Sequence, residues 1–356
     1  MVLVTAGGGS RAIAELLEVP GASRTVVEAV VPYAPVAMCR WLGAKPDEFC
    51  SSQTVRSLAV AAFRRACDYE TSGVPLAGIS CTASLASDRP KRGPHRAHIA
   101  AQTAATTAAW YLPLLKDRRT RAEEERLLGR LLLNVIAEVC RIPGRLPLEL
   151  LEGEKLESEF FEAPEDWRKL FLGESPFVCC GSERTPPKCV LPGAFNPWHE
   201  GHQRMAELAG KMLSAPTVLE LSIENMDKPP LDYLEIRRRL AQFPPEQTVY
   251  LTRAAAFEQK ARLFPGATFV VGMDTLQRLV QPHYYGEDAT ARDRALRAIV
   301  GQGCHFLVFD RYVAGSLLRL KDLELPEELR AVCREVPPEV FCLDISSTTL
   351  RCQGNM

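Results

Sequence analysis

The spacing of hydrophobic positions changes repeatedly along this chain, and the changes are clearest in its second half. There, short apolar runs alternate with segments in which apolar residues recur every three or four positions. The short runs predict strands at 188–192, 217–223, 247–251, 267–272, 304–309 and 339–343. The periodic segments predict helices at 200–214, 231–242, 256–263, 274–280 and 288–300. This alternation favours a doubly wound parallel sheet with helices on both faces.

The first half shows a similar alternation with less regular spacing. It predicts strands at 26–33, 76–82, 98–107 and 111–115, and helices at 10–17, 54–68 and 120–140. The last helix has a clear apolar face formed by Leu127, Leu131, Val135 and Val139. We therefore expect a second α/β domain in this half.

Between the two halves, proline and acidic residues interrupt the periodicity. This segment predicts a linker with one short helix near 165–171. The expected organisation is an α/β domain at 1–143, an acidic linker at 144–187 and a second α/β domain at 188–356. A length of 356 residues is consistent with two domains.

Composition and charge exclude several classes of protein. The net charge of −1 gives no basis for attraction to nucleic acid or to a membrane surface. No apolar run approaches the roughly 20 residues of a membrane span, and the N-terminus has no basic region of a secretory signal. The twelve cysteines follow no disulfide or zinc-binding spacing. We therefore expect a cytoplasmic protein that binds neither nucleic acid nor membrane.

The strongest chemical signal is the string GAFNPWHEGH at 193–202. It follows a predicted strand and opens a predicted helix, so His199 and His202 lie within one turn at a helix N-terminus. Unpaired backbone N–H groups and partial positive charge make such an end an anion site. Gly201, between the histidines, carries no side chain to block a phosphate. The turn therefore predicts a polyphosphate-binding site.

This string resembles the signature of the HxGH nucleotidylyltransferases, whose domain is Rossmann-like. The second signature of that superfamily, ISSTxxR, is matched by ISSTTLR at 345–351. The resemblance implies that His199 and His202 contact ATP phosphates and stabilise charge on the transferred α-phosphate. Further ATP contacts are implied for Gly193, Phe195, Asn196, Gly201, Arg311, Ser346, Ser347, Thr348 and Arg351. ATP and Mg²⁺ are the implied cofactors, with the ion held mainly by phosphates and water and by no protein metal site.

Three further positions carry alternatives. The resemblance makes Lys228 a candidate phosphate contact for the second substrate, against a solvent-facing lysine. Asp274, in a G-x-D string typical of pyridine-nucleotide adenylyltransferases, is either a substrate ligand or a helix cap. Trp198 either stacks on a base or ribose or packs within the domain.

The first half resembles the C-terminal domain of the CinA family, known for nicotinamide-nucleotide amidase activity. The resemblance rests on the glycine turn 7–9, on Val-Pro-Gly at 19–21 and on Gly-Ile-Ser at 78–80. Reactive positions differ, because Ala6 stands where active relatives carry serine and Met38 where they carry lysine. We therefore expect amidase activity to be lost, although the glycine turn could still cradle a phosphate.

Together these features predict a nucleotidyltransferase that joins ATP to nicotinamide or nicotinate mononucleotide, releasing pyrophosphate. Its partners would be ATP and a small phosphorylated substrate. The sequence leaves open whether the chain forms a homo-oligomer. One alternative is an HxGH transferase for phosphopantetheine, FMN or a cytidylyl acceptor. Another is a nucleotide-binding pseudoenzyme or an assembly subunit.

Overall fold

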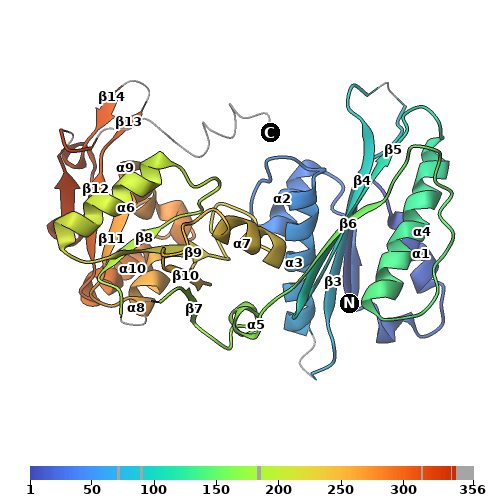
Figure 1. The fold of residues 1–356 in the computed structure, drawn as a ribbon, viewed down its shortest axis with the longest axis horizontal. Helices are drawn as coiled ribbons and strands as arrows, with labels where there is room; N and C mark the ends of the chain where they lie inside the picture. The colour runs from blue at the N-terminus through green and yellow to red at the C-terminus, as the bar shows by residue number, and fades with distance from the viewer. Residues whose placement is uncertain (70–72, 89–90, 183–185, 314–315, 338, 342–356) are drawn as a thin grey trace. The chain divides into compact units, whose positions relative to one another are not determined.

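The computed structural model describes residues 1–69, 73–88, 91–182, 186–313, 316–337 and 339–341. The chain forms two compact units. Unit 1 comprises Met1–Leu172 and Asp227–Ile236, and unit 2 comprises Gly173–Met226 and Arg237–Met356. Both are α/β, as the sequence predicted (Figure 1).

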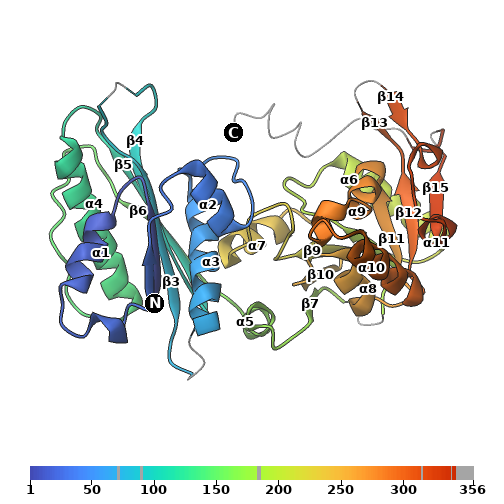
Figure 2. The same ribbon diagram turned by 180° about the vertical axis from the view of Figure 1, so that it is seen from behind.

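Unit 1 contains a six-stranded sheet in the order β2-β1-β3-β4-β5-β6. The strands are β1 (Val2–Ala6), β2 (Glu28–Val30), β3 (Ala77–Ser84), β4 (His95–Thr103), β5 (Thr106–Leu114) and β6 (Glu157–Glu162). The first three are parallel to one another and the last three run antiparallel to their neighbours. Helices α1 (Ser10–Leu17) and α4 (Arg121–Val139) cover one face (Figure 2). The other face carries α2 (Pro35–Leu42) and α3 (Ser52–Tyr69).

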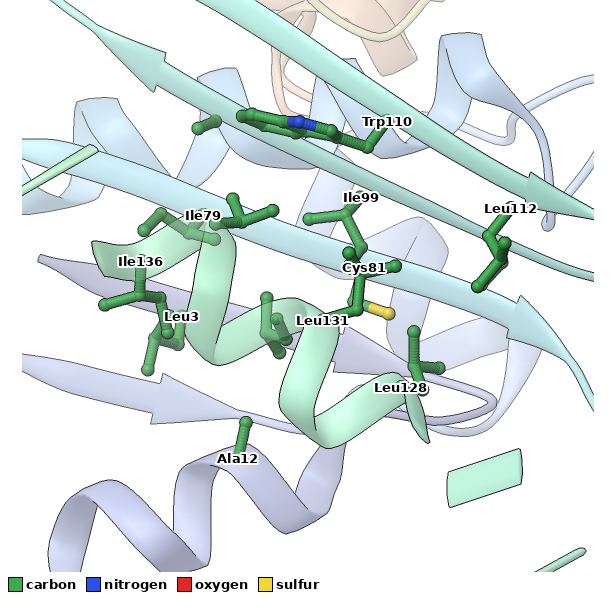
Figure 3. Packing of buried hydrophobic residues seen from close by; sticks show 14 of the residues in the cluster. Leu3, Ala12, Ile79, Cys81, Ile99, Trp110, Leu112, Leu128, Leu131 and Ile136 are labelled. Carbon is green, nitrogen blue, oxygen red and sulfur yellow. The ribbon is translucent and has the colours of Figure 1, made fainter. Parts of the chain in front are cut away.

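Apolar side chains along β1 point alternately to the two faces of this sheet and contribute to a hydrophobic core on each face. Leu3 packs with Ile79, Ile99 and Leu131 beneath α4 (Figure 3), while its neighbours Val2 and Val4 join a cluster with α2 and α3. Successive strand residues point to opposite faces, so one short apolar strand serves both cores.

The turn between β4 and β5 lies away from its predicted place. The sequence predicts one strand over 98–107, but β4 ends at Thr103 and β5 begins at Thr106. The Thr103 hydroxyl accepts the amides of Ala105, at 3.2 Å, and Thr106, at 2.9 Å. A threonine side chain fixes the turn locally, within an alanine-rich run whose spacing gives no sign of it.

The segment 144–187, expected as a linker, contributes to both sheets. Its strand β6 pairs with β5, and β7 (Phe177–Cys180) pairs with β10 (Val249–Thr252) of unit 2. Between them lies α5 (Glu165–Leu172), close to the predicted helix. Most β6 side chains are exposed on an edge strand, so their sequence lacks the apolar alternation that would have predicted a strand.

Unit 1 also includes Asp227–Ile236, although the surrounding sequence belongs to unit 2. Asp232 is 1% exposed and accepts a 3.0 Å hydrogen bond from Arg56 Nε of α3. The Tyr233 hydroxyl donates to Ala104 O at 2.7 Å, and its amide donates to the Thr107 hydroxyl at 3.1 Å. Buried polar pairing of this kind makes the segment a structural part of unit 1.

Unit 2 contains a seven-stranded sheet in the order β15-β12-β11-β8-β9-β10-β7. Its parallel strands are β8 (Cys189–Pro192), β9 (Thr217–Ser222), β10 (Val249–Thr252), β11 (Thr268–Gly272), β12 (His305–Phe309) and β15 (Cys333–Val336). Strand β7 is antiparallel at the edge. The last strand therefore precedes its predicted place at 339–343.

The helices of unit 2 follow the predicted pattern closely. The five predicted helices are α6 (Glu200–Leu213), α7 (Tyr233–Leu240, whose first four residues belong to unit 1), α8 (Phe257–Leu263), α9 (Met273–Leu279) and α10 (Ala289–Gly301). A further short helix, α11 (Glu327–Ala331), was not predicted. A short hairpin of β13 (Arg311–Val313) and β14 (Ser316–Leu318) follows β12. Because the chain runs from β8 outward through β9 and β10 and then returns to β11, strand order reverses between β8 and β11. Ligands in doubly wound sheets bind at the carboxyl ends of strands beside such a switch point.

Candidate active site

The HxGH turn lies at this switch point. It follows β8, in the middle of the unit 2 sheet, and leads into α6. The Gly193 amide donates to Glu220 O of β9 at 3.0 Å, which extends the ladder one residue beyond β8. The turn therefore begins at the carboxyl edge of the sheet.

Both histidines stand at the N-terminus of α6. His199 is the N-cap, with extended backbone angles of φ −146° and ψ 169°. Its carbonyl accepts the His202 amide at 2.9 Å and the Gln203 amide at 3.2 Å, which begins the helix. The two imidazole rings stack with centroids 3.7 Å apart. Two imidazoles and a helix N-terminus therefore converge at one point suited to anionic oxygen.

Phe195 supports the histidines from within the domain. It is 1% exposed, and its ring meets His202 edge-on at 5.2 Å between centroids. An added Cβ at Gly193 would lie 2.5 Å from this ring, so the ring packs directly on the glycine backbone. The sequence made Phe195 a candidate ATP contact. The buried ring also shapes the turn, and its contact with ATP stays a prediction.

Trp198 is part of the same aromatic cluster. Its ring lies parallel to that of His202, at 5.3 Å and 11°, and meets Phe195 and Phe243 edge-on, both at 5.4 Å. Of the two alternatives for this residue, the structure shows packing within the domain.

Two side chains at and beyond the end of α7 hold the backbone of the turn, and sequence reasoning missed both. Arg239, 4% exposed, donates to Ala194 O at 2.7 Å. Gln242 accepts the Trp198 amide at 3.0 Å and donates to Phe195 O at 3.1 Å. The run of three arginines at 237–239 was the available signal, but its spacing is equally typical of a solvated helix face.

A neighbouring arginine orients Asn196. Arg238 donates to Asn196 Oδ1 at 2.5 Å. The side chain at the asparagine position of the motif is therefore aligned by a cation of the same unit.

Asp274 follows β11, the strand on the other side of the switch point. The N-cap of α9 is Gly272, with no side-chain capping bond, so Asp274 is not the cap. It forms an exposed ion pair with Arg278 at 3.4 Å. Asp274 and the histidines thus follow adjacent parallel strands of one sheet, which is the arrangement expected of residues around a shared ligand.

The remaining candidate residues belong to other segments of the chain. Lys228 is exposed and belongs to the segment of unit 1, whereas the histidines belong to unit 2. Arg311 is the first residue of β13. The last motif, with Ser346, Ser347, Thr348 and Arg351, lies outside the described residues.

An acidic pair stands at the end of β12. Asp310 is 4% exposed, and burial together with the neighbouring Glu335 raises its pKa to about 6. Glu335 accepts the Leu320 amide at 3.0 Å, and its pKa is lowered. Within this pair the proton therefore resides on Asp310 in mildly acidic solution.

In unit 1, the positions that would carry amidase chemistry are apolar. Ala6 and Met38 are 5% and 4% exposed and pack in one hydrophobic cluster. Ser80, in the Gly-Ile-Ser string at 78–80, is fully buried and donates to Val55 O at 2.5 Å. Neither arrangement contains an activated hydroxyl.

The glycine turn of unit 1, a candidate phosphate cradle, holds a carboxylate of this chain. Glu125 Oε2 accepts the Gly9 amide at 3.0 Å, and Oε1 accepts the Arg11 amide at 3.1 Å and the Ser10 hydroxyl at 3.2 Å. The donors at the start of α1 are therefore occupied by Glu125 in place of a phosphate.

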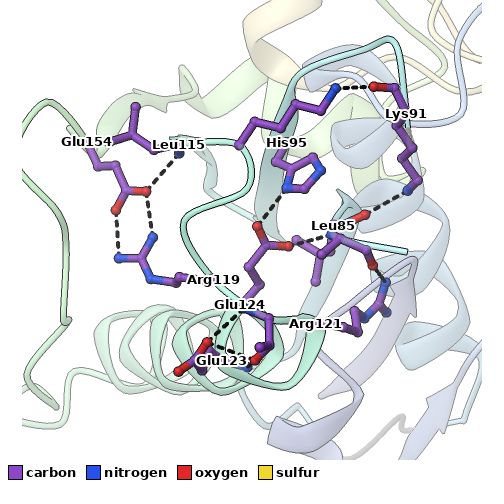
Figure 4. Close-up of polar contacts among 12 residues, drawn as sticks. Leu85, Lys91, His95, Leu115, Arg119, Arg121, Glu123, Glu124 and Glu154 are labelled. Atoms are coloured by element: carbon purple, nitrogen blue, oxygen red, sulfur yellow. Dashed lines mark hydrogen bonds and ion pairs between the residues drawn. The ribbon is translucent and has the colours of Figure 1, made fainter. Parts of the chain in front are cut away.

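Polar contacts at the start of α4 fix the loops around this turn (Figure 4). Glu124, fully buried, lies 2.7 Å from His95 Nδ1 and accepts the Ala86 amide at 2.6 Å. Arg121 donates to Gly7 O at 2.9 Å, and Arg119 to Glu154 at 2.6 Å. These contacts hold the loops around the turn in place.

Among the described residues, no group of three or more His, Cys, Asp or Glu could hold a metal ion. In the same part of the chain, no helix is long and apolar enough to cross a membrane.

Comparison with known proteins yields little. No family model and no curated protein matches the chain. Among solved structures, it is similar to the competence or damage-inducible protein from Enterobacter asburiae, with 18% identity and a TM-score of 0.30. That alignment covers 39% of this chain and 87% of the other.

Proposed function

We propose that unit 2 transfers an adenylyl group from ATP to a small phosphorylated acceptor, nicotinamide or nicotinate mononucleotide. The observation that carries the proposal is the stacked pair His199 and His202 at the N-terminus of α6, directly after the central strand β8. The sequence around the pair supplies the motif, and a helix N-terminus beside the switch point supports an anion site there.

In the proposed reaction an oxygen of the acceptor phosphate attacks the α-phosphorus of ATP. The bond from that phosphorus to the bridging oxygen breaks, and pyrophosphate leaves with the electron pair. No nucleophile of the protein is needed, because positioning and charge stabilisation dominate such transfers. The imidazoles and the amides of α6 would stabilise the charge that grows on the transferred group.

Mg²⁺ would neutralise the phosphates and the leaving pyrophosphate. The donor set at the turn suits an ion carried in on the nucleotide, because the ion prefers oxygen ligands. The polar side chains of the turn are two imidazoles, the Asn196 amide and the Glu200 carboxylate, which is paired with Arg204.

Pyrophosphate release tests the proposal. Purified full-length protein would be given ATP and Mg²⁺ with nicotinamide mononucleotide, nicotinate mononucleotide, phosphopantetheine or FMN in turn. We expect release with a pyridine mononucleotide, and its loss in His199→Ala and His202→Ala. His305→Ala is the matched control, because that histidine is exposed at the opposite, amino end of β12. Release only with another acceptor would show that the acceptor is not a pyridine mononucleotide. ATP binding without release from any acceptor would contradict transferase activity.

We also propose that unit 1 has no amidase activity. The proposal rests on the apolar pair Ala6 and Met38 and on Ser10, whose hydroxyl donates to Glu125. Full-length protein should release no ammonia from nicotinamide mononucleotide. Release that disappears in Ser10→Ala would show a relocated nucleophile and overturn it.

A further inference from the structure

A polar layer lies between the sheet of unit 1 and the start of α3. Strand register places Thr82 beside His98, and His98 beside Tyr111, in one row across β3, β4 and β5. This row faces α3, because Ser80, two residues before Thr82 on the same face, donates to Val55 O of that helix. Arg96, two residues from His98, lies on that face as well.

Two side chains in this layer are buried with a polar atom that has no strong hydrogen-bond partner. His98 is 8% exposed and its Nδ1 has no partner, while the ring stacks on Tyr111 at 4.8 Å. Thr82 is 1% exposed, and its Oγ1 has no strong hydrogen-bond partner. Its polar neighbour is the Cys50 thiol, a weak partner. Buried polar groups in folded proteins are nearly always satisfied, so a pair in one row indicates a further component.

The start of α3 adds donors and positive charge to this row. Ser51 caps the helix, because its hydroxyl accepts the Thr54 amide at 3.1 Å and its carbonyl accepts the Val55 amide at 3.1 Å. The amides of Ser52 and Gln53 precede these bonds at the start of an 18-residue helix, where such groups have no acceptor within the helix. Arg96 donates to Cys50 O at 3.0 Å and lies 3.7 Å from Glu48, an exposed carboxylate. Such an exposed pair is weak, so Arg96 can turn to another anion.

The half-buried residues at the helix start provide access to the layer. Cys50, Ser51 and Ser52 are each partly exposed. Burial and the two guanidiniums of Arg96 and Arg56 lower the pKa of His98 to about 4. The imidazole is therefore neutral near pH 7 and offers one N–H donor whose position depends on the tautomer.

We propose that this layer is a binding site for a phosphate group, formed by Thr82, His98, Arg96 and the first amides of α3. The Thr82 hydroxyl and the His98 imidazole would donate to phosphate oxygens from the sheet, and the helix amides from the opposite side. The site is distinct from the glycine turn, whose donors Glu125 occupies. It is also independent of the proposed transferase chemistry, since every residue in it belongs to unit 1.

The phosphate could be free or part of a nucleotide, and the experiment separates the two. Full-length protein with ¹⁵N-labelled histidine rings would be titrated with orthophosphate, nicotinamide mononucleotide and nicotinamide riboside, which has no phosphate. We expect the His98 Nδ1 resonance, assigned with His98→Phe, to shift with a phosphate-bearing probe and not with the riboside. A larger affinity for the mononucleotide than for orthophosphate would identify a nucleotide site.

Matched variants decide whether the shift reports this site. Thr82→Val and Arg96→Gln should each weaken binding roughly tenfold, as expected for one lost charged or buried hydrogen bond. His283→Phe, an exposed histidine of unit 2, should change nothing. Because Arg96 is partly exposed, Arg96→Gln should fold normally. It therefore still tests the site if Thr82→Val has a folding defect. No His98 shift at millimolar phosphate, or equal shifts in all variants, would overturn the proposal. Titration in a His202→Ala background without ATP keeps this result separate from transferase activity.

Discussion

Trp198 lies against His202, with their rings 5.3 Å apart between centroids and 11° from parallel. One imidazole of the candidate active site is thus held by an aromatic cluster that also contains Phe195 and Phe243. Such packing fixes a side chain's orientation before substrate binds, which is what charge stabilisation in a transition state requires.

His202→Ala should therefore affect both catalysis and stability. Turnover should fall on the order of a hundredfold, the usual loss for one stabilising donor. The free energy of unfolding should fall by roughly 1 kcal/mol, because the ring contacts with Trp198 and Phe195 are lost. Pyrophosphate release at saturating ATP and urea unfolding measure the two effects. Unchanged turnover in a folded variant would remove His202 from the mechanism.

Arg239 should act as a positioning residue. Its guanidinium holds Ala194 O from a site that is 4% exposed. Arg239→Met keeps much of the stem and leaves that carbonyl without its donor, at a cost of about 1–3 kcal/mol. We expect kcat to fall more than KM rises, because the turn loses its alignment while the histidines stay present. Arg262→Met, a mostly exposed arginine of α8, is the control. Equal kinetics for the two variants would contradict the role.

Glu125 should keep phosphate out of the glycine turn of unit 1. In Glu125→Gln, a neutral amide oxygen replaces the carboxylate opposite the Gly9 and Arg11 amides, and an anion should compete with it more easily. We expect the Gly9 amide resonance to be insensitive to orthophosphate in the unaltered chain and to shift in the variant. A shift of the same size in both proteins would show that Glu125 does not block the turn.

Much of the arrangement of unit 2 could be predicted from sequence, because the strands β8 to β12 are short apolar runs and the helices between them are amphipathic. The predicted helix 200–214 and the observed α6 differ by one residue, and the histidines lie where the motif placed them. The support for the turn could not be predicted. Arg239 and Gln242 contact it only through the fold, and no local pattern marks an arginine that reaches a backbone carbonyl about 45 positions away.

Unit 1 shows the same limit in another form. The apolar periodicity of 120–140 predicted α4. Strand β6 was not predicted, because it is an exposed edge strand and its sequence has no alternation of apolar and polar residues. The segment 227–236 was assigned to the second domain because sequence position alone suggested it. Its attachment to unit 1 depends on the hydrogen bond between Asp232 and Arg56, which are 176 positions apart in the sequence.

His98 should stay neutral through most of the physiological range. Its pKa is lowered from 6.5 to about 4, so the unfolded chain binds a proton that the folded chain rejects. Its contribution to stability is therefore full above pH 6.5 and is lost as the pH falls from 6.5 through 4. An NMR titration of the imidazole should show no transition above pH 5. A midpoint near 6.5 would mean that His98 is solvated in the folded protein.

The buried pair of Arg56 and Asp232 should be a main attachment of the segment 227–236 to unit 1. Their side chains are 10% and 1% exposed, and Glu235 lies 3.6 Å from the same guanidinium. Asp232→Ala leaves a buried cation with less compensation, which should cost about 3–5 kcal/mol. Hydrogen exchange of amides in β5, where Thr107 accepts the Tyr233 amide, should then accelerate. Arg65→Met, an exposed arginine of the same helix, provides the control. If Asp232→Ala leaves β5 exchange unchanged, the segment is not held to unit 1 by this pair, and the aromatic contact of Tyr233 with Phe171 at 4.7 Å must hold it instead.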